Sequence, residues 1–364
     1  MNVRDESTPD EAPRAAHSNG EGPAPAGAAG RLAPAGTARR RVVAAGASLL
    51  AAAALPSVKA QPAAWPARPL RMLIAFPAGG ATDILGRAFA AKLGEALGQP
   101  VVVENRPGAG GMIGIEAAAK SPADGYTMFL CSLTNQAIAA GLYPNPPADI
   151  VRDFVPVSLV ANIPHWLVVN AAVPARSVTE LSAWLKANSG KVNYASQGNG
   201  TLSHLESELL LQRLGVEMTH VAYKGSTNAH PDLLAGSVSM MFDSITASLP
   251  HVRAGRLRAL AVASSRRAGI APDVPTMQEA GLRGYEVDNW FGFYFPKGTP
   301  REIVDRLDRE LAKVAASADV KDRLLQQGVD LFHEGPARLA AVTASETERW
   351  PRIVREANVK LQGS

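Results

Sequence analysis

Cysteine is nearly missing from this chain of 364 residues, because Cys131 is the only one. A single cysteine excludes a disulfide within the chain and argues against a thiolate metal site. It lies in the apolar run 129–133, so we interpret it as a small buried hydrophobic side chain. The seven histidines are scattered, and no two stand four residues apart as on one helix face. The sequence therefore predicts neither a metal site nor a cofactor.

Aromatic and charged residues are also scarce, at 5% and 19% of the chain, with a formal net charge of +4. A nucleic-acid-binding surface concentrates positive charge on one face, and no basic cluster recurs along this sequence. Nucleic acid is therefore not expected as a partner. Hydrophobic residues make up 46%, which is typical of a globular protein with one large core or two ordinary ones.

No apolar run in the N-terminal region is long enough for a comfortable membrane span. The apolar stretch 42–55 follows Arg39–Arg41 and precedes a small-residue site that ends at Ala60. A basic segment, a short apolar segment and such a site predict an export signal that is cleaved near Ala60. The arginines also fit a twin-arginine signal. Residues 1–38 are rich in Ala, Pro, Gly and Ser, and we expect them to be disordered, with the fold beginning near Gln61.

A strand, a Gly-Gly turn and a helix start follow one another soon after this segment. The apolar run 72–76 leads into the turn, and Thr82 and Asp83 open a predicted helix over 84–97. Such a unit directs several backbone N–H groups at one point, where the helix dipole adds positive charge. The stretch fits an anion, either a carboxylate or a phosphate. The alternative is an ordinary connection between a strand and a helix.

Strands and helices then alternate at the spacing of parallel βαβ units. The glycine-rich stretch 108–114 does not have the spacing of a dinucleotide fingerprint, and no acidic residue follows about twenty residues later. Ser177, followed three residues later by Glu180, has the capping-box pattern and is predicted to cap the helix that it opens. After Pro300 the chain is predicted to be helical to its end. Further strands are predicted at 101–104, 127–133, 192–195, 220–223, 238–242 and 257–263, and helices at 112–120, 177–188, 202–214, 232–235, 302–316, 319–327 and 336–358.

Two long extended stretches, 153–170 and 285–295, separate two α/β regions. This order predicts an α/β fold of two lobes, joined by two crossover strands, with a hinged cleft between them. The first lobe is predicted to contain 61–163 and 285–364, and the second 164–284.

Short polar side chains follow the predicted strands of both regions. Hydroxyl and amide donors bind an anion without needing an arginine. Asp83 and Asp243 fit less well, since each would accept from a ligand hydroxyl or ammonium group, cap a helix or satisfy buried backbone. The candidate donors are Thr82, Ser132, Asn135, Asn199, Thr201 and Ser203.

An exported hydrolase is one alternative, because Ser203, His204 and Asp243 are the residue types of a catalytic triad. However, no Gly-x-Ser-x-Gly motif surrounds Ser203, and neighbouring residues of a helix point about 100° apart. A sensory module on the same fold is a second alternative. The export signal and the absence of a DNA-binding segment count against it. The sequence therefore favours a binding protein over an enzyme.

The region from about Trp65 to Leu361 resembles the TctC or Bug family, the substrate-binding proteins of tripartite tricarboxylate transporters. The resemblance depends on many motifs that occur in the same order as in that family. They are 65–69, 76–83, 103–111, 124–126, 153–156, 223–225, 232–234 and 241–243.

This resemblance implies a type II periplasmic-binding-protein fold and a periplasmic receptor. Binding proteins of this layout can work as monomers, and a monomer is expected here. Its ligand would be a small carboxylate, a di- or tricarboxylate or an aromatic acid, delivered to membrane subunits of the transporter. In the family, loops that match 76–83 and 196–203 hold carboxylate groups, partly through water. The resemblance thus adds Phe76, Ala78, Gly79, Gly80, Ala81, Ser196 and Gly200 to the candidate ligand-binding residues, beside Thr82, Asp83, Ser132, Asn135, Thr201, Ser203 and Asp243.

The chain departs from the family pattern at several positions. Asn228 follows the 223–225 motif where relatives tend to have proline, and His230 and Trp166 stand where aliphatic residues are usual. Trp166 and Trp290 either flank the cleft, which would favour an aromatic or bulky acid, or pack the hinge.

Overall fold

The computed structural model describes residues 65–143, 145–356 and 359. These described residues form one compact unit. The predicted export signal and its cleavage site near Ala60 lie outside the described residues. Within the described ranges, no helix is both long and apolar enough to cross a membrane.

One sheet of the described chain has six strands. Their spatial order is β11 (Asp330–Glu334), β4 (Phe154–Asn162), β10 (Trp290–Pro296), β3 (Thr127–Ser132), β1 (Leu70–Ile74) and β2 (Val101–Asn105). Strand β1 is parallel to β2 and β3, whereas β10 is antiparallel to β3 and β4, and β11 is antiparallel to β4.

A second sheet of the described residues has five strands. Their spatial order is β7 (Thr219–Ala222), β6 (Asn193–Ser196), β8 (Met240–Ser244), β5 (His165–Asn170) and β9 (Leu257–Val262). Strand β6 is parallel to β7 and β8, whereas β5 is antiparallel to β8 and β9.

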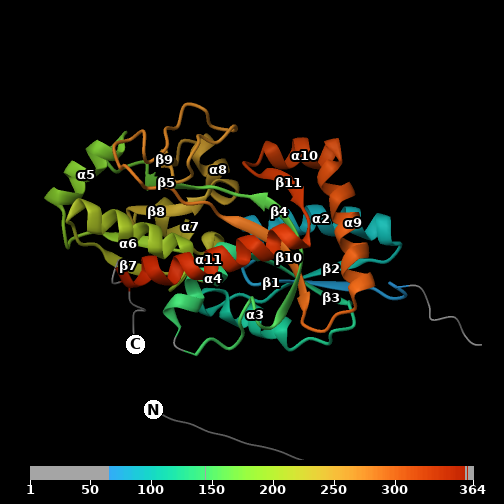
Figure 1. The fold of residues 1–364 in the computed structure, drawn as a ribbon. Helices are drawn as coiled ribbons and strands as arrows, with labels where there is room; N and C mark the ends of the chain where they lie inside the picture. The colour runs from blue at the N-terminus through green and yellow to red at the C-terminus, as the bar shows by residue number, and fades with distance from the viewer. Residues whose placement is uncertain (1–64, 144, 357–358, 360–364) are drawn as a thin grey trace, which may run out of the picture. The chain divides into compact units, whose positions relative to one another are not determined.

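The chain passes twice between the two sheets. Ile163 and Pro164 separate β4 from β5, and the segment 263–289 separates β9 from β10. We call the elements of the six-stranded sheet the first lobe and those of the five-stranded sheet the second lobe (Figure 1). The predicted lobe boundaries at 163/164 and 284/285 stay predictions. The first lies between β4 and β5 and the second between β9 and β10, and the two strands of each pair belong to different sheets.

Helices cover both faces of each sheet, so the central strands are buried on both sides, as parallel strands usually are. In the first lobe α2, α9 and α10 pack on one face, and α3, α4 and α11 on the other. In the second lobe α5 and α6 cover one face, and α7 and α8 the other. The helices are α2 (Ala81–Leu97), α3 (Met112–Ala119), α4 (Leu133–Leu142), α5 (Val178–Ala187), α6 (Leu202–Leu214), α7 (Ser226–Ala235), α8 (Ile245–Arg253), α9 (Arg301–Ala316), α10 (Ala318–Leu325) and α11 (Pro336–Glu356), with a 3₁₀ turn η2 (Ala109–Gly111).

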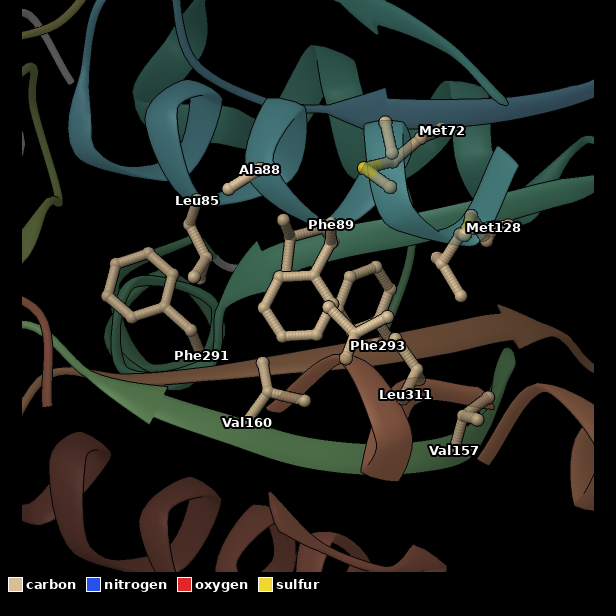
Figure 2. Close-up of a cluster of buried hydrophobic side chains, with 14 of the residues drawn as sticks. Met72, Leu85, Ala88, Phe89, Met128, Val157, Val160, Phe291, Phe293 and Leu311 are labelled. Atoms are coloured by element: carbon tan, nitrogen blue, oxygen red, sulfur yellow. The ribbon is translucent and has the colours of Figure 1, made fainter. Parts of the chain in front are cut away.

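The core beneath α2 is a layer of aromatic, aliphatic and methionine side chains (Figure 2). Phe89 of α2 meets Phe293 of β10 with ring centroids 5.3 Å apart at 52°, a tilted arrangement that aromatic pairs favour. Both rings are fully buried. This packing fixes α2, and with it the loop before α2, on the sheet.

Helices α4 and α11 contact the cores of both lobes. Leu339 and Val342 of α11 belong to the first-lobe core, whereas Trp350 and Val354 belong to the core of the second. Figure 1 shows α11 alongside α4, and a Cβ on Gly141 of α4 would lie only 2.7 Å from Pro351 Cα. Gly141 therefore permits the close approach of the two helices that span the lobes.

Several sequence predictions of local structure need correction. The first strand is Leu70–Ile74 rather than 72–76, and the following helix begins at Ala81 rather than at residue 84. The region after Pro300 is not helical throughout, since β11 adds to the edge of β4. Helices α4 and α8 were not expected, because each begins directly after a strand, without a turn of small residues to mark its start.

Helix α5 has the N-cap that the sequence predicts. The Ser177 hydroxyl accepts a hydrogen bond from Glu180 N–H at 3.1 Å, and the Glu180 carboxylate accepts from Arg176 N–H at 2.8 Å. We expect Ser177→Ala to lower the free energy of unfolding by about 1 kcal/mol, measured by urea denaturation. Ser177→Thr, which keeps the hydroxyl, should lower the free energy of unfolding by less. Equal losses in the two variants would contradict the capping role.

Candidate functional site

A small cavity lies between the two lobes, and residues of both lobes line it. Its volume is about 20 Å³, room for a water-sized group, so a larger ligand requires the lobes to separate. The lining residues are Phe76, Pro77, Gly80, Ala81, Thr82, Ser132, Asn135 and Phe291 from the first lobe, His165, Gln197, Ser226 and Ser244 from the second, and Asn289 from the second crossover.

Four helices begin at this cavity. Gly80 caps α2, Ser132 caps α4, Ser226 is the first residue of α7, and Ser244 caps α8, and all four residues line the cavity. The first N–H groups of a helix have no partner within it, and the helix dipole adds positive charge there. None of the described lining residues is Lys or Arg. The cavity is therefore suited to an anion that is bound by neutral donors.

Asp83 braces the loop 76–83 instead of lining the cavity. Its carboxylate accepts from Gly79 N–H at 2.9 Å, Arg87 Nε at 2.8 Å and Asn105 Nδ2 at 3.0 Å. Asn105 Nδ2 also donates to the Phe76 carbonyl at 2.9 Å. Burial alone would raise the pKa of Asp83, but the hydrogen bonds from Arg87, Gly79 and Asn105 lower it overall. The ionised carboxylate thus fixes the shape of the loop whose end lines the cavity.

Asn135 connects the lobes. Its Nδ2 donates to Ser132 Oγ at 2.7 Å, and its Oδ1 accepts from Leu202 N–H, the first amide of α6 in the second lobe, at 2.8 Å. The Ser132 hydroxyl in turn donates to Asn289 Oδ1 at 2.6 Å. These bonds hold the two lobes in contact at the wall of the cavity.

Asp243 is fully buried behind the second-lobe wall. Its Oδ1 accepts from Ser226 Oγ at 2.6 Å, Gln197 Nε2 at 3.1 Å and Ser244 N–H at 2.9 Å. His230 Nε2 lies 2.8 Å from its Oδ2. Burial would raise the pKa of Asp243, but the hydrogen bonds and the charge of His230 lower it overall. Asp243 therefore orients three lining residues and does not itself reach the cavity.

Of the predicted loop 196–203, Gln197 lines the cavity, whereas the five candidate residues Ser196, Asn199, Gly200, Thr201 and Ser203 do not. Ser196 Oγ pairs with His220 Nε2 at 2.6 Å, and Thr201 Oγ1 donates to the Gly198 carbonyl at 2.7 Å. Gly200 donates its N–H to His204 Nδ1 at 3.3 Å. These residues support the loop from behind.

Ser203 is buried, and its hydroxyl donates to the Phe242 carbonyl at 2.5 Å. Among the described residues no hydrogen bond joins Ser203 Oγ to His204 or Asp243. The arrangement that a hydrolytic triad requires is not assembled here.

His165 was missed by the sequence prediction, as were Gln197, Ser226, Ser244 and Asn289. His165 Nδ1 lies 2.6 Å from Glu206 Oε2, and both side chains are fully buried. Burial would lower the pKa of His165, but the Glu206 carboxylate outweighs it and raises that pKa. His165 opens β5 opposite Ser244 at the end of β8. The position of His165 directly after the first crossover was the one sequence feature that could have indicated a residue of the cavity.

The two tryptophans that were considered as cleft residues line no part of this cavity. Trp166 is buried in the second-lobe core, where its Nε1 donates to Ser248 Oγ at 2.7 Å. Trp290 packs edge-on against Phe332 with ring centroids 6.2 Å apart. Trp166 is thus an interior residue and Trp290 a partly buried one that packs against the first-lobe core, so they give no reason to expect an aromatic ligand.

A stack of three rings lies under the loop 196–203. His220 stacks on His204 with centroids 4.1 Å apart and on Tyr194 at 4.9 Å. Burial lowers the pKa of His204 to about 4, and burial together with His204 lowers that of His220 to about 3. Both rings are therefore neutral at physiological pH.

We expect this stack to make the protein acid-sensitive. The ordinary histidine pKa is about 6.5, so below that pH the unfolded chain takes up protons that the stacked rings do not. The stability that these groups give is present above this pH and is lost as the pH falls towards their lowered pKa values. His220→Phe keeps the stack but cannot be protonated, so its free energy of unfolding should fall less between about pH 7 and about pH 4. An equal fall in urea denaturation would contradict this account.

Comparison with known proteins gives the family. The model of the tripartite tricarboxylate transporter family receptor, TctC, matches residues 85–359. The UPF0065 protein in the tcbD-tcbE intergenic region of Pseudomonas sp. (strain P51) is 44% identical over 87% of this chain and 94% of its own length. Protein BugT of Bordetella pertussis is 41% identical over 82% of this chain and 92% of its own.

Solved structures resemble the fold at 32–35% identity. The periplasmic binding protein BugD has a TM-score of 0.79 and 35% identity, covering 82% of this chain and 100% of its own. Rhodopseudomonas palustris Rpa4515 with adipate has a TM-score of 0.79 and 34% identity, covering 81% and 99%. MatC from the same organism, with bound malate, has a TM-score of 0.76 and 32% identity, covering 80% and 100%. The chain thus belongs to the TctC family and is a periplasmic solute-binding receptor of the two-lobe type II fold, not an enzyme.

Proposed function

We propose that this receptor captures a small aliphatic di- or tricarboxylate between its two lobes. The observation that carries the proposal is the convergence of four helix N-termini on one cavity. The dipoles of these four helices favour negative charge at their N-termini, and the hydroxyl and amide side chains between them add neutral donors. A carboxylate group presents two acceptor oxygens to such donors and can bind partly through water.

Two structural relatives support the choice of ligand class. Rpa4515 is described with adipate and MatC with malate, both of which are dicarboxylates. Because neither tryptophan lines the cavity, a compact aliphatic acid fits better than an aromatic one. We expect the lobes to open for entry and to close over the acid, so that the affinity reflects the closed state.

We also propose a route of export for the receptor and a membrane partner to which it delivers its ligand. The N-terminal signal directs the chain to the periplasm, with cleavage near Ala60 and a sequence that also fits the twin-arginine route. There the receptor works as a monomer and delivers its acid to membrane subunits of a tripartite tricarboxylate transporter.

Thermal unfolding against a panel of acids tests the ligand class. A ligand that binds only the folded state raises the midpoint by mass action. We expect a clear, concentration-dependent shift with one of succinate, malate, adipate or citrate, and a smaller one or none with benzoate. A shift with benzoate alone would move the assignment to aromatic acids. No shift with any acid, for protein free of co-purified ligand, would contradict the proposal.

A further inference from the structure

A negative charge lies directly behind the wall of this anion-binding cavity. Asp243 is fully buried, and the hydrogen bonds that it accepts from Ser226 and Gln197 join it to two residues of the cavity lining. An uncompensated carboxylate at this depth would repel a ligand carboxylate more strongly than the same charge in water, because the interior screens it less. A receptor for anions therefore needs a positive charge beside Asp243.

His230 is placed to supply that charge. Its Nε2 lies 2.8 Å from Asp243 Oδ2, whereas the three bonds from the cavity side all go to Oδ1. The His230 side chain is 8% exposed. Burial would lower its pKa, but the hydrogen bond and charge of Asp243 raise the pKa overall, so His230 carries its proton more readily than a free histidine.

The other titratable groups around this pair do not replace His230. His251 of α8 meets the His230 ring edge-on at 4.8 Å, and burial, His230 and Arg256 lower its pKa, which favours its neutral form. The charge of His165 also acts on Asp243, but His165 is itself paired with Glu206. His230 is therefore the group that offsets the charge of Asp243.

The wall in front of the pair can receive either a carboxylate or a hydroxyl group. The Ser226 proton is donated to Asp243, so Ser226 Oγ offers the cavity lone pairs that accept from a hydroxyl. Ser244 Oγ is buried at the start of α8, has no partner among the described residues, and can donate or accept. The hydrogen-bonding groups of this wall thus suit a carboxylate as well as a hydroxyl group of a ligand. The net charge behind the wall determines which of the two groups binds more tightly.

We propose that His230 determines the ligand specificity of the cavity: paired with Asp243, it makes the second-lobe wall electrically neutral, so that the receptor accepts a second carboxylate there in preference to a hydroxyl. This inference rests on the proposed function, the capture of a carboxylate. The first carboxylate binds at the start of α2, and the His230–Asp243 pair selects what the far end of the ligand carries.

Matched ligands test this selection by calorimetric titration. Adipate and 6-hydroxyhexanoate have equal chain length and differ in one end, as do malate and 2,4-dihydroxybutanoate. We expect the unchanged protein to bind the dicarboxylate of a pair more tightly near a pH of about 6.5. In His230→Gln, whose amide keeps a donor to Asp243 without the charge, the preference should shift towards the hydroxy acid by about tenfold.

Two further variants separate charge from structure. His251→Gln removes the neighbouring histidine that does not contact Asp243, and it should leave the preference unchanged. The double variant His230→Gln with Asp243→Asn removes both charges, so its preference should return towards that of the unchanged protein. The preference of the unchanged protein should also decline as the pH rises through the raised pKa of His230, whereas that of His230→Gln should decline less.

The outcomes distinguish this inference from the proposed function. If the acids bind but His230→Gln keeps the preference of the unchanged protein, the role of His230 is wrong and carboxylate capture stands. If His251→Gln shifts the preference as much, the effect is not specific to the pair, and the inference also fails. If no acid of either pair binds the unchanged protein, and neither succinate nor citrate binds it, both the proposed function and the inference are overturned.

Discussion

Gly110→Ala is expected to weaken carboxylate binding by about 10- to 100-fold while both lobes stay folded. Gly110 lies in η2 of the first lobe with φ +62°, and a Cβ at this position would overlap the carbonyl oxygen of Asn199 in the second lobe. That overlap exists only when the lobes are in contact, so the substitution opposes the closed state. A ligand that binds the closed state then loses affinity in proportion to its population.

Gly98→Ala is the matched control for this prediction. Gly98 ends α2 with φ +67°, and a Cβ there would meet no atom of the described residues within 4 Å. The two variants share the same left-handed backbone strain, so they should lose similar stability, and only Gly110→Ala should lose affinity. Titration with the acid that gives the largest thermal shift measures this. Equal affinities in the two variants would show that contact between these loops is not needed for binding.

Asp83→Asn is expected to weaken binding about tenfold and to lower the free energy of unfolding by about 1–3 kcal/mol. Asp83 accepts from Gly79 N–H, Arg87 and Asn105, and it holds the loop that ends at the start of α2. An asparagine amide presents N–H groups to at least one of these donors, so the loop loses its fixed shape. Since the pKa of Asp83 is lowered in the folded state, this stabilisation is present above the ordinary pKa of about 3.8 and is lost as the pH falls through the folded value.

Asp153→Asn provides a comparison in the same lobe. Asp153 also accepts from a backbone amide, that of Asp149, and from an arginine, Arg152, and it lies outside the cavity lining. Both variants should lower the midpoint of urea denaturation at neutral pH, but only Asp83→Asn should raise the dissociation constant of the acid. Loss of affinity in both would point to a general loss of stability instead of a role of this loop.

The sequence predicts the first-lobe side of the site better than the second. A strand, a glycine turn and a helix start are consecutive in the chain, so the loop before α2 could be located from local pattern alone. The six predicted residues that line the cavity, namely Phe76, Gly80, Ala81, Thr82, Ser132 and Asn135, all come from the first lobe.

The second-lobe residues required information that the local pattern does not contain. His165 and Ser244 meet because β5 and β8 pair across 79 positions of sequence, and Asn289 reaches the cavity only through the second crossover. The sequence indicated small residues at the ends of strands, but it did not indicate which of them face the cavity. Ser196, Thr201, Ser203 and Asp243 are such residues, and they support the wall from behind.

For the fold as well, elements that depend on neighbouring residues were predicted from the sequence, whereas an element that depends on a distant strand was missed. Helix α6 has the predicted bounds, 202–214, and the predicted cap of α5 is present, because both depend on neighbouring residues. Strand β11 was missed, since it pairs with β4 at the sheet edge, far away in sequence. Its residues 330–334 are only partly buried or exposed and have no strong alternation of their own.

The most direct test of the central claim is a calorimetric titration of the purified protein with succinate, malate, adipate, citrate and 1,6-hexanediol. The diol has the length of adipate but no charge, so it separates the attraction of the helix N-termini for an anion from simple filling of the cavity. We predict a single site that binds at least one of the four acids and does not bind the diol. Binding of the diol as tightly as the best acid, or of none of the acids, would contradict the claim.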